Sequence, residues 1–139
     1  MDNKKHIVAV TAVIKNKSGD RFLMVRRNKN EIAFPGKWAL SGGKLESGEN
    51  IMAVLKREVM EEVGLNIEEW KQFLRDYTFV RPDGHNVVGL CFLVKAVSEK
   101  ARLSDEFEDF KWIKPEELGS YSYDPIDRME REVGIAFGG

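Results

Sequence analysis

The sequence is poor in three features: cysteine, net charge and long apolar runs. Its one cysteine, Cys91, cannot form a disulfide within the chain and lies in an apolar stretch, 87–97, that is typical of a buried strand. The 22 basic and 23 acidic residues give a net charge of −1. This balance excludes a uniformly basic binder of nucleic-acid polymers and an acidic disordered tail. The longest apolar runs, of about ten residues, are too short to span a bilayer.

The chain also lacks the segments that mark targeting, repetition or a phosphate loop. Its N-terminus has neither the apolar segment nor the cleavage site of a signal peptide, so we expect a cytoplasmic protein without a membrane partner. There is no repeat or low-complexity stretch, and 139 residues with 42% hydrophobic content suit a single domain over 1–139. The absence of a G-x-x-x-x-G-K-[ST] run excludes a P-loop NTPase.

What the sequence does contain is an alternation of strand-like and helical segments. β-branched and aromatic residues between turn signals predict strands at 7–14, 21–27, 70–80, 86–97 and 107–113, the first two as a hairpin. A polar loop is expected at 28–37, a short apolar stretch at 38–40, and a glycine-containing loop at 41–43.

Helix signals interrupt and follow these strands. The clearest helix is expected at 49–63, capped by Ser47 or Gly48 and ended by Gly64. One helical turn is expected at 115–118, and a second helix at 124–133, ended by Gly134. This order of elements indicates an α+β or mixed α/β layered domain.

The central helix carries an unusual set of carboxylates. Glu58, Glu61 and Glu62 stand at i, i+3 and i+4 and therefore share one face, where like charges destabilise a helix and raise one another's pKa. A divalent cation with oxygen ligands would offset this repulsion. The alternative is a solvated acidic face on a helix whose core face is formed by Met52, Leu55, Val59 and Val63.

Two further features favour a ligand over a solvated face. Glu49 lies near the first turn of the expected helix, where a carboxylate meets the helix dipole and can fold back towards Arg57. Gly42 and Gly43 precede it, and glycine allows the backbone to approach a ligand or the helix closely.

The segment from Gly43 to Leu65 resembles the signature of the Nudix hydrolases, G-x5-E-x7-R-E-U-x-E-E-x-G-U, where U is a bulky aliphatic residue. The matching positions are Gly43, Glu49, Arg57, Glu58, Val59, Glu61, Glu62, Gly64 and Leu65. The strands expected on either side fit the MutT-like Nudix fold. The resemblance thus implies an α+β fold with a mixed β-sheet sandwiched between α-helices (α/β/α) over most of the chain.

The resemblance also implies roles for these residues. Glu58, Glu61 and Glu62 are expected to bind Mg²⁺, or Mn²⁺, with help from the carbonyl of Gly42, and Arg57 to orient Glu49 through an ion pair. A further acidic residue of MutT-like members stands six positions before a tryptophan, which here is Glu106 before Trp112; its close competitors are Asp105, Glu108 and Asp109. The general base is one of Glu58, Glu61, Glu62 or Glu106. Our preferred assignment has Glu58 or Glu62 bound to the metal, with Glu106 as the alternative base.

Residues outside the signature supply candidates for substrate binding. Arg26, Arg27 and Lys37 are candidates to contact phosphates, although each alone is as readily a surface cation. Phe34, Trp38 and Phe79 are candidates to stack on a base, the alternative being that they belong to the core.

The family reaction hydrolyses a nucleoside diphosphate linked to another group, so a nucleoside triphosphate gives a monophosphate and pyrophosphate. The runs at 34–43 and 106–118 resemble bacterial family members that prefer pyrimidine deoxynucleoside triphosphates, and Ser41 agrees with that subgroup. The alternatives are another nucleotide substrate (an oxidised purine triphosphate, ADP-ribose or a nucleotide sugar) and a non-catalytic nucleotide-binding regulator. Family members are often homodimers, so a homodimer is a further expectation.

Overall fold

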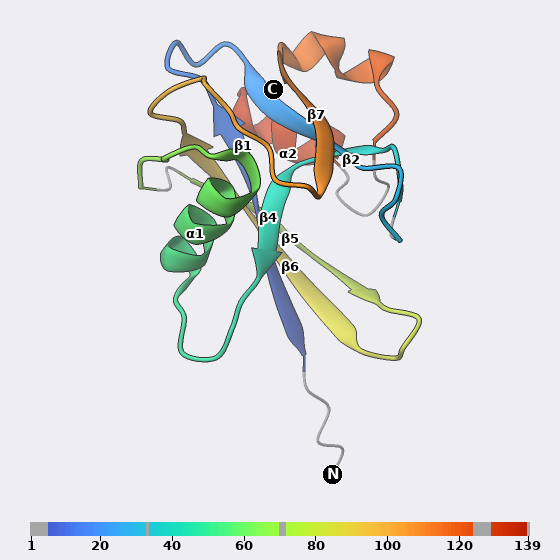
Figure 1. Cartoon of the computed structure of the whole chain (residues 1–139). Coiled ribbons are helices and arrows are strands. Elements are labelled where there is room, and N and C mark those ends of the chain that lie inside the picture. The colour runs from blue at the N-terminus through green and yellow to red at the C-terminus, as the bar shows by residue number, and fades with distance from the viewer. Residues whose placement is uncertain (1–5, 33, 70–71, 124–128, 139) are drawn as a thin grey trace.

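A twisted mixed sheet forms the centre of the molecule (Figure 1). The computed structural model describes residues 6–32, 34–69, 72–123 and 129–138. Over these residues the strands are β1 (Ile7–Lys15), β2 (Phe22–Arg27), β3 (Trp38–Ala39), β4 (Ser41–Lys44), β5 (Gln72–Val80), β6 (Asn86–Lys95) and β7 (Phe107–Ile113). The helices are α1 (Ile51–Val63), the short 3₁₀ helix η1 (Pro115–Ser120) and α2 (Met129–Ala136).

The sheet divides along one edge of β1. On its other edge β1 pairs in parallel with β6 along its whole length, from Ile7 opposite Val87 to Lys15 opposite Lys95. Two strands share the dividing edge of β1: β4 pairs with Ala9–Ala12, and β2 pairs only at Lys15. β2 continues the sheet with β3 and β7, and β5 forms the far edge beside β6.

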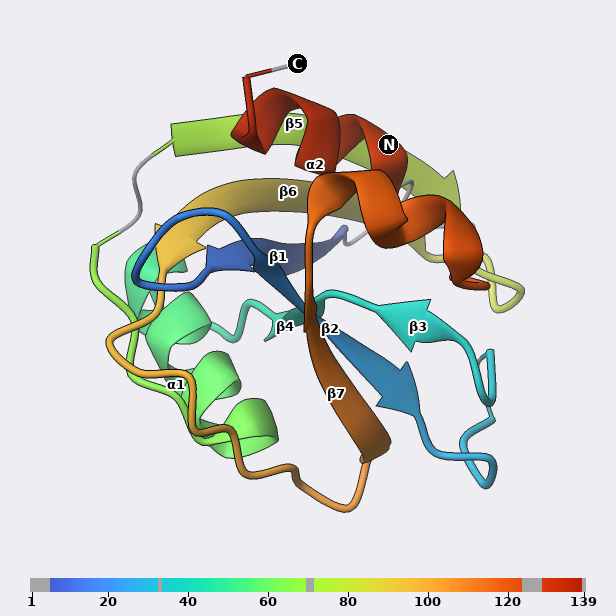
Figure 2. The same cartoon turned by 90° about the horizontal axis from the view of Figure 1, so that it is seen from above.

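Two hydrophobic clusters lie on the two faces of the sheet. Val10, Ala12 and Ile14 of β1 pack with the apolar face of α1, whereas Val13 packs with Met129 and Val133 of α2. Neighbouring strand residues point to opposite faces, which explains this division. The two helices therefore lie on opposite sides of β1 and β6 (Figure 2). This arrangement confirms the predicted α+β fold with a mixed sheet between helices.

Several expected boundaries are corrected by the structure. Helix α1 begins at Ile51, not 49, because the cap is Asn50, whose Oδ1 accepts a 2.9 Å hydrogen bond from the Ala53 amide; neither Ser47 nor Gly48 caps it. The expected loop 41–43 is part of strand β4, since it pairs with β1. β6 ends at Lys95 rather than 97.

The structure confirms one of the two glycines that were expected to end a helix. Gly64 ends α1 in the left-handed conformation, with φ of 67°, as predicted. Gly134 does not end α2, which continues to Ala136 because Val133 and Ala136 are both buried against the sheet. The start expected at 124 lies outside the described residues. No helix in the described part of the chain is long and apolar enough to cross a membrane.

Candidate active site

Arg57 joins the loop before helix α1 to the carboxylates of that helix. Its Nε and Nη2 donate hydrogen bonds of 3.0 and 2.9 Å to the two carboxylate oxygens of Glu49, so the predicted ion pair is present in bidentate form. This pairing lowers the pKa of Glu49 and raises that of Arg57. The remaining nitrogen, Nη1, donates to Glu58 Oε1 at 2.9 Å. A single guanidinium thus fixes the loop before α1 and orients a carboxylate of the helix.

Glu58 lies directly against the backbone of Gly43. A Cβ atom at position 43 would stand 2.3 Å from the Glu58 Cδ atom, a distance that real side chains do not adopt. Burial raises the pKa of Glu58, and the guanidinium of Arg57 opposes this rise. The glycine therefore lets the carboxylate of α1 approach strand β4 closely.

Among the α1 carboxylates Glu58, Glu61 and Glu62, Glu62 is the most deeply buried, with 7% of its surface exposed. Its Oε1 accepts hydrogen bonds from the Ser41 hydroxyl at 2.7 Å and from the Gly42 amide at 3.0 Å. Burial raises its pKa to about 8, and the neighbouring carboxyl of Glu106, which shares a hydrogen bond with it, acts in the same direction. Glu61 differs, because its side chain is 58% exposed and reaches Arg57 only at 3.5 Å.

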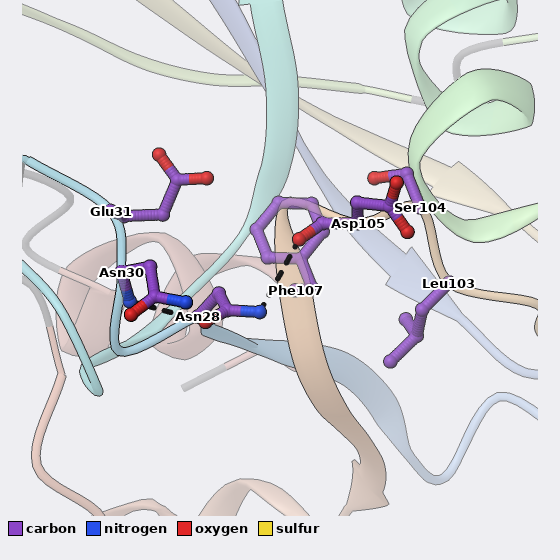
Figure 3. A pocket seen from close by; sticks show the side chains of 7 residues that line it. All are labelled: Asn28, Asn30, Glu31, Leu103, Ser104, Asp105 and Phe107. Carbon is purple, nitrogen blue, oxygen red and sulfur yellow. Dashed lines mark hydrogen bonds between the residues drawn. The ribbon is translucent and has the colours of Figure 1, made fainter.

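Glu106 is distinguished from its acidic neighbours by where its side chain lies. Glu106 lines the same cavity as Glu62, whereas Glu108 forms an ion pair with Arg26 at 3.4 Å. Asp105 faces a separate polar hollow of about 510 Å³ between the β2–β3 and β6–β7 loops (Figure 3). The carboxylate of Asp109 accepts a hydrogen bond from the Phe110 amide.

Asn28 connects the two loops beside this hollow. Its amide N–H donates to the Glu106 carbonyl at 3.0 Å, and its side-chain Nδ2 donates to the Asp105 carbonyl at 3.4 Å (Figure 3). Its Oδ1 accepts from the Asn30 amide. The loop after β2 therefore fixes the backbone that carries Glu106.

A cavity of about 800 Å³ extends from Glu62 and Glu106 across the face of the sheet. Its volume is usual for small-molecule sites. Glu62, Glu106, Gly42 and Gly43 form its acidic end. Ala9 and Thr11 of β1, with Tyr77 and Phe79 of β5, line another part. The walls come from the β2–β3 loop, with Ile32 and Phe34, and from the β5–β6 turn, with Val80, Arg81, Pro82 and Asp83.

The structure brings only some of the candidate substrate-binding residues to this cavity. Arg27, Phe34 and Phe79 line it. Trp38 does not: it is buried in the cluster beneath α2, edge-on to the Tyr121 ring. Lys37 is also absent from the lining, because its ammonium donates to the Ser122 hydroxyl at 2.7 Å.

Tyr77 and the β5–β6 turn line the cavity but were not among our candidates. The alternation of Tyr77 and Phe79 along one strand is the signal that points to a shared face. That the β5–β6 turn lines the same cavity as Glu62 depends on pairings between distant segments, which local sequence patterns do not reveal.

The carboxylates of the described residues do not complete a cation site by themselves. Within the described ranges, no three Asp, Glu, His or Cys side chains converge closely enough to hold a metal ion by themselves. Magnesium characteristically takes one or two protein carboxylates and fills its shell with water and phosphate oxygens. Glu58 and Glu62, whose pKa values are both raised by burial, fit such a partial site because a cation would offset the cost of ionising them.

Comparisons with known proteins agree with this geometry. The model of the NUDIX domain family matches residues 5–133. The nucleoside triphosphatase NudI of Klebsiella pneumoniae subsp. pneumoniae is 34% identical over 136 residues, covering 90% of this chain and 94% of that protein. A MutT protein from Methanosarcina mazei Go1 has a TM-score of 0.77 at 29% identity, covering 95% and 94% of the two chains. The E. coli ORF135 protein, at 23% identity, shares the fold with a TM-score of 0.81, covering 100% of this chain and 95% of that one.

Proposed function

This chain belongs to the Nudix family, and we propose that it is a nucleoside triphosphate pyrophosphohydrolase that depends on a divalent cation and releases a monophosphate and pyrophosphate. The observation that carries this proposal is that Glu62 and Glu106 line a nucleotide-sized cavity together, while Glu58 lies against the cavity-lining Gly43 and interacts with Glu106. The relatives named as nucleoside triphosphatases support the same substrate class.

In this proposal Glu58 and Glu62 are the principal ligands of the cation, Mg²⁺ with Mn²⁺ as a substitute. Glu61 and the carbonyl of Gly42 complete the set. The bound cation would neutralise polyphosphate charge and lower the pKa of a coordinated water. Arg57 keeps Glu58 oriented through its Nη1, while its fork on Glu49 prevents the guanidinium from turning away.

Glu106 is our choice for the general base. Its side chain lines the cavity and interacts with Glu62, so a proton taken from an attacking water would stay within one pair of carboxyls. Arg27 lines the same cavity from the end of β2, and in this proposal its guanidinium binds the phosphates of the substrate. By the same proposal, pyrimidine deoxynucleoside triphosphates are the preferred substrates.

A nucleotide panel tests this function. The purified protein is assayed with the ribonucleoside and deoxyribonucleoside triphosphates, an oxidised purine triphosphate, ADP-ribose and a nucleotide sugar. Each substrate is tested with Mg²⁺, with Mn²⁺ or with a chelator. Products are identified in ¹⁸O-labelled water, which reports the phosphorus attacked. We expect monophosphate and pyrophosphate from a pyrimidine deoxynucleotide, and no turnover with the chelator.

The isosteric variants Glu62→Gln and Glu61→Gln complete the experiment. We expect Glu62→Gln to lose most of the turnover. Absence of turnover on every substrate, with Glu61→Gln indistinguishable from wild type, would contradict an enzymatic function. Hydrolysis of ADP-ribose well above dCTP and dTTP would retain the hydrolase and replace the proposed substrate.

A further inference from the structure

A row of four residues from neighbouring strands crosses the sheet beside the cavity. The strand register places Tyr77 of β5 opposite Gly89 of β6, Gly89 beside Ala9 of β1, and Ala9 opposite Lys44 of β4. Tyr77, Ala9 and Lys44 all line the cavity, whereas Gly89 is buried. Between the large side chains of Tyr77 and Lys44, this row therefore holds only a glycine and an alanine.

Gly89 is required by the Tyr77 ring and not by its own backbone. A Cβ atom at position 89 would stand 2.1 Å from the Tyr77 Cζ atom and within 2.5 Å of both Cε atoms. The φ angle of Gly89 lies outside the left-handed range, so the strand itself would accept alanine. The ring of Tyr77 thus lies down across β6 in space that any other residue at 89 would fill.

Neighbouring side chains hold the ring in this position. The Arg75 guanidinium lies 5.9 Å from the centre of the Tyr77 ring and forms an ion pair at 3.3 Å with Glu132, which is fully buried on α2. The Phe79 ring lies 6.3 Å from the Tyr77 ring and parallel to it within 9°. Two aromatic planes are therefore presented together, half-buried, to the cavity.

We propose that Tyr77 and Phe79 form the surface on which the nucleobase of the substrate stacks, and that Gly89 is the positioning residue that keeps the Tyr77 ring flat. This inference rests on the proposed function. The acidic end of the cavity, at Glu62 and Glu106, receives the phosphates with their cation, which leaves the aromatic surface for the base. Every nucleobase has a π-face, so this contact selects ligands that carry a base over base-free polyphosphates.

Binding measurements separate this role from a structural one. The affinity for the α,β-methylene analogue of a pyrimidine deoxynucleoside triphosphate is measured by calorimetry with Mg²⁺, beside that for inorganic tripolyphosphate. We expect Tyr77→Ala to weaken nucleotide binding by about tenfold to a hundredfold and to change tripolyphosphate binding by less than about twofold. Tyr77→Phe keeps the ring and should bind nucleotide within about threefold of wild type. Phe73→Ala, which removes a more exposed aromatic side chain from the same strand, is the matched control.

A double-mutant cycle tests the role of Gly89. Gly89→Ala should weaken nucleotide binding in the wild-type background and have little effect in the Tyr77→Ala background, where there is no ring to displace. Equal losses for the nucleotide and tripolyphosphate, or no loss with Tyr77→Ala, would overturn the stacking surface. An undiminished effect of Gly89→Ala without the ring, or no effect with it, would overturn the positioning role. Because the ligand is not hydrolysed, a protein that binds as expected but fails the turnover panel would contradict the proposed function alone.

Discussion

The Ser41 hydroxyl donates a 2.7 Å hydrogen bond to the buried carboxylate of Glu62, across 21 residues of sequence. The Gly42 amide donates to the same oxygen. Both bonds favour the charged form of Glu62, against the burial that favours the neutral form. Strand β4 therefore supplies two donors that favour ionisation of the buried Glu62 carboxyl, the state that its proposed role as a cation ligand requires.

Removing this hydroxyl should weaken cation binding more than it weakens turnover. In Ser41→Ala the Glu62 carboxyl loses a donor to its charged form, so we expect the Mg²⁺ concentration for half-maximal activity to rise about tenfold or more. The maximal rate at saturating Mg²⁺ should stay close to that of wild type. Ser18→Ala, which removes a hydroxyl from an exposed turn, is the control. An unchanged Mg²⁺ requirement would show that Ser41 does not support the ligand.

The raised pKa of Glu62 predicts a pH-dependent stability of the metal-free protein. The folded state keeps Glu62 protonated up to about pH 8, whereas an unfolded chain ionises it near 4.5. The folded state therefore binds the extra proton between these values, and this contribution to stability is lost as pH rises through that window. Glu62→Gln cannot ionise and should escape the loss.

Thermal unfolding with a chelator at pH 5 and pH 8 measures this effect. The unfolding temperature of Glu62→Gln, relative to wild type, should rise by about 10 °C between the two pH values. Added Mg²⁺ at pH 8 should stabilise wild type more than the variant. Glu61→Gln, which alters a largely exposed carboxylate of the same helix, should follow wild type. Parallel curves for Glu62→Gln and wild type would contradict the prediction.

The local sequence was sufficient to predict helix α1 and its C-terminal end, but not its first residue or its N-cap. The spacing of Glu49 and Arg57 anticipated their ion pair, and Gly64 marked the helix end correctly. Ser41–Lys44 could not be identified as a strand, because its composition (SGGK) has no strand preference and it is extended only through pairing with β1.

The sequence did not distinguish the alternatives for residues whose position depends on distant segments. Trp38 is a plausible stacking residue by type, but Tyr121 lies against it and makes it part of the core. The importance of Tyr77 depends on its register with Gly89, a pairing that neither segment reveals alone. Aromatic type identified candidates, and only the sheet register decided which of them faces the cavity.

Because Arg57 contacts Glu49 through two nitrogens, we expect that a positive charge at position 57 is not sufficient for full activity. Lysine keeps the charge but cannot reproduce the fork, so Arg57→Lys should lower kcat/KM by about 10- to 100-fold. Glu49→Gln should have a similar effect, and the double variant should be only slightly worse than either, because both act through one contact. The control is Lys56→Ala, which removes an exposed pair with Glu69. Additive losses in the double variant would show that the two residues act separately.

Replacing Gly42 or Gly43 by alanine should have different effects: the change at 43 should lower turnover, and the change at 42 should lower stability. At position 43 the new Cβ meets the Glu58 carboxylate, whose side chain can move, so Gly43→Ala should fold while displacing a proposed ligand of the cation. A shift of this kind can cost about a hundredfold in rate. At position 42 the Cβ would stand 2.0 Å from the Val10 carbonyl oxygen, so Gly42→Ala must separate β4 from β1 and should lower the unfolding temperature. Gly119→Ala, with no atom within 4 Å, is the control for both. Parallel assays of turnover and thermal unfolding distinguish the two effects, and near-normal turnover in Gly43→Ala would show that the Glu58 position is not critical.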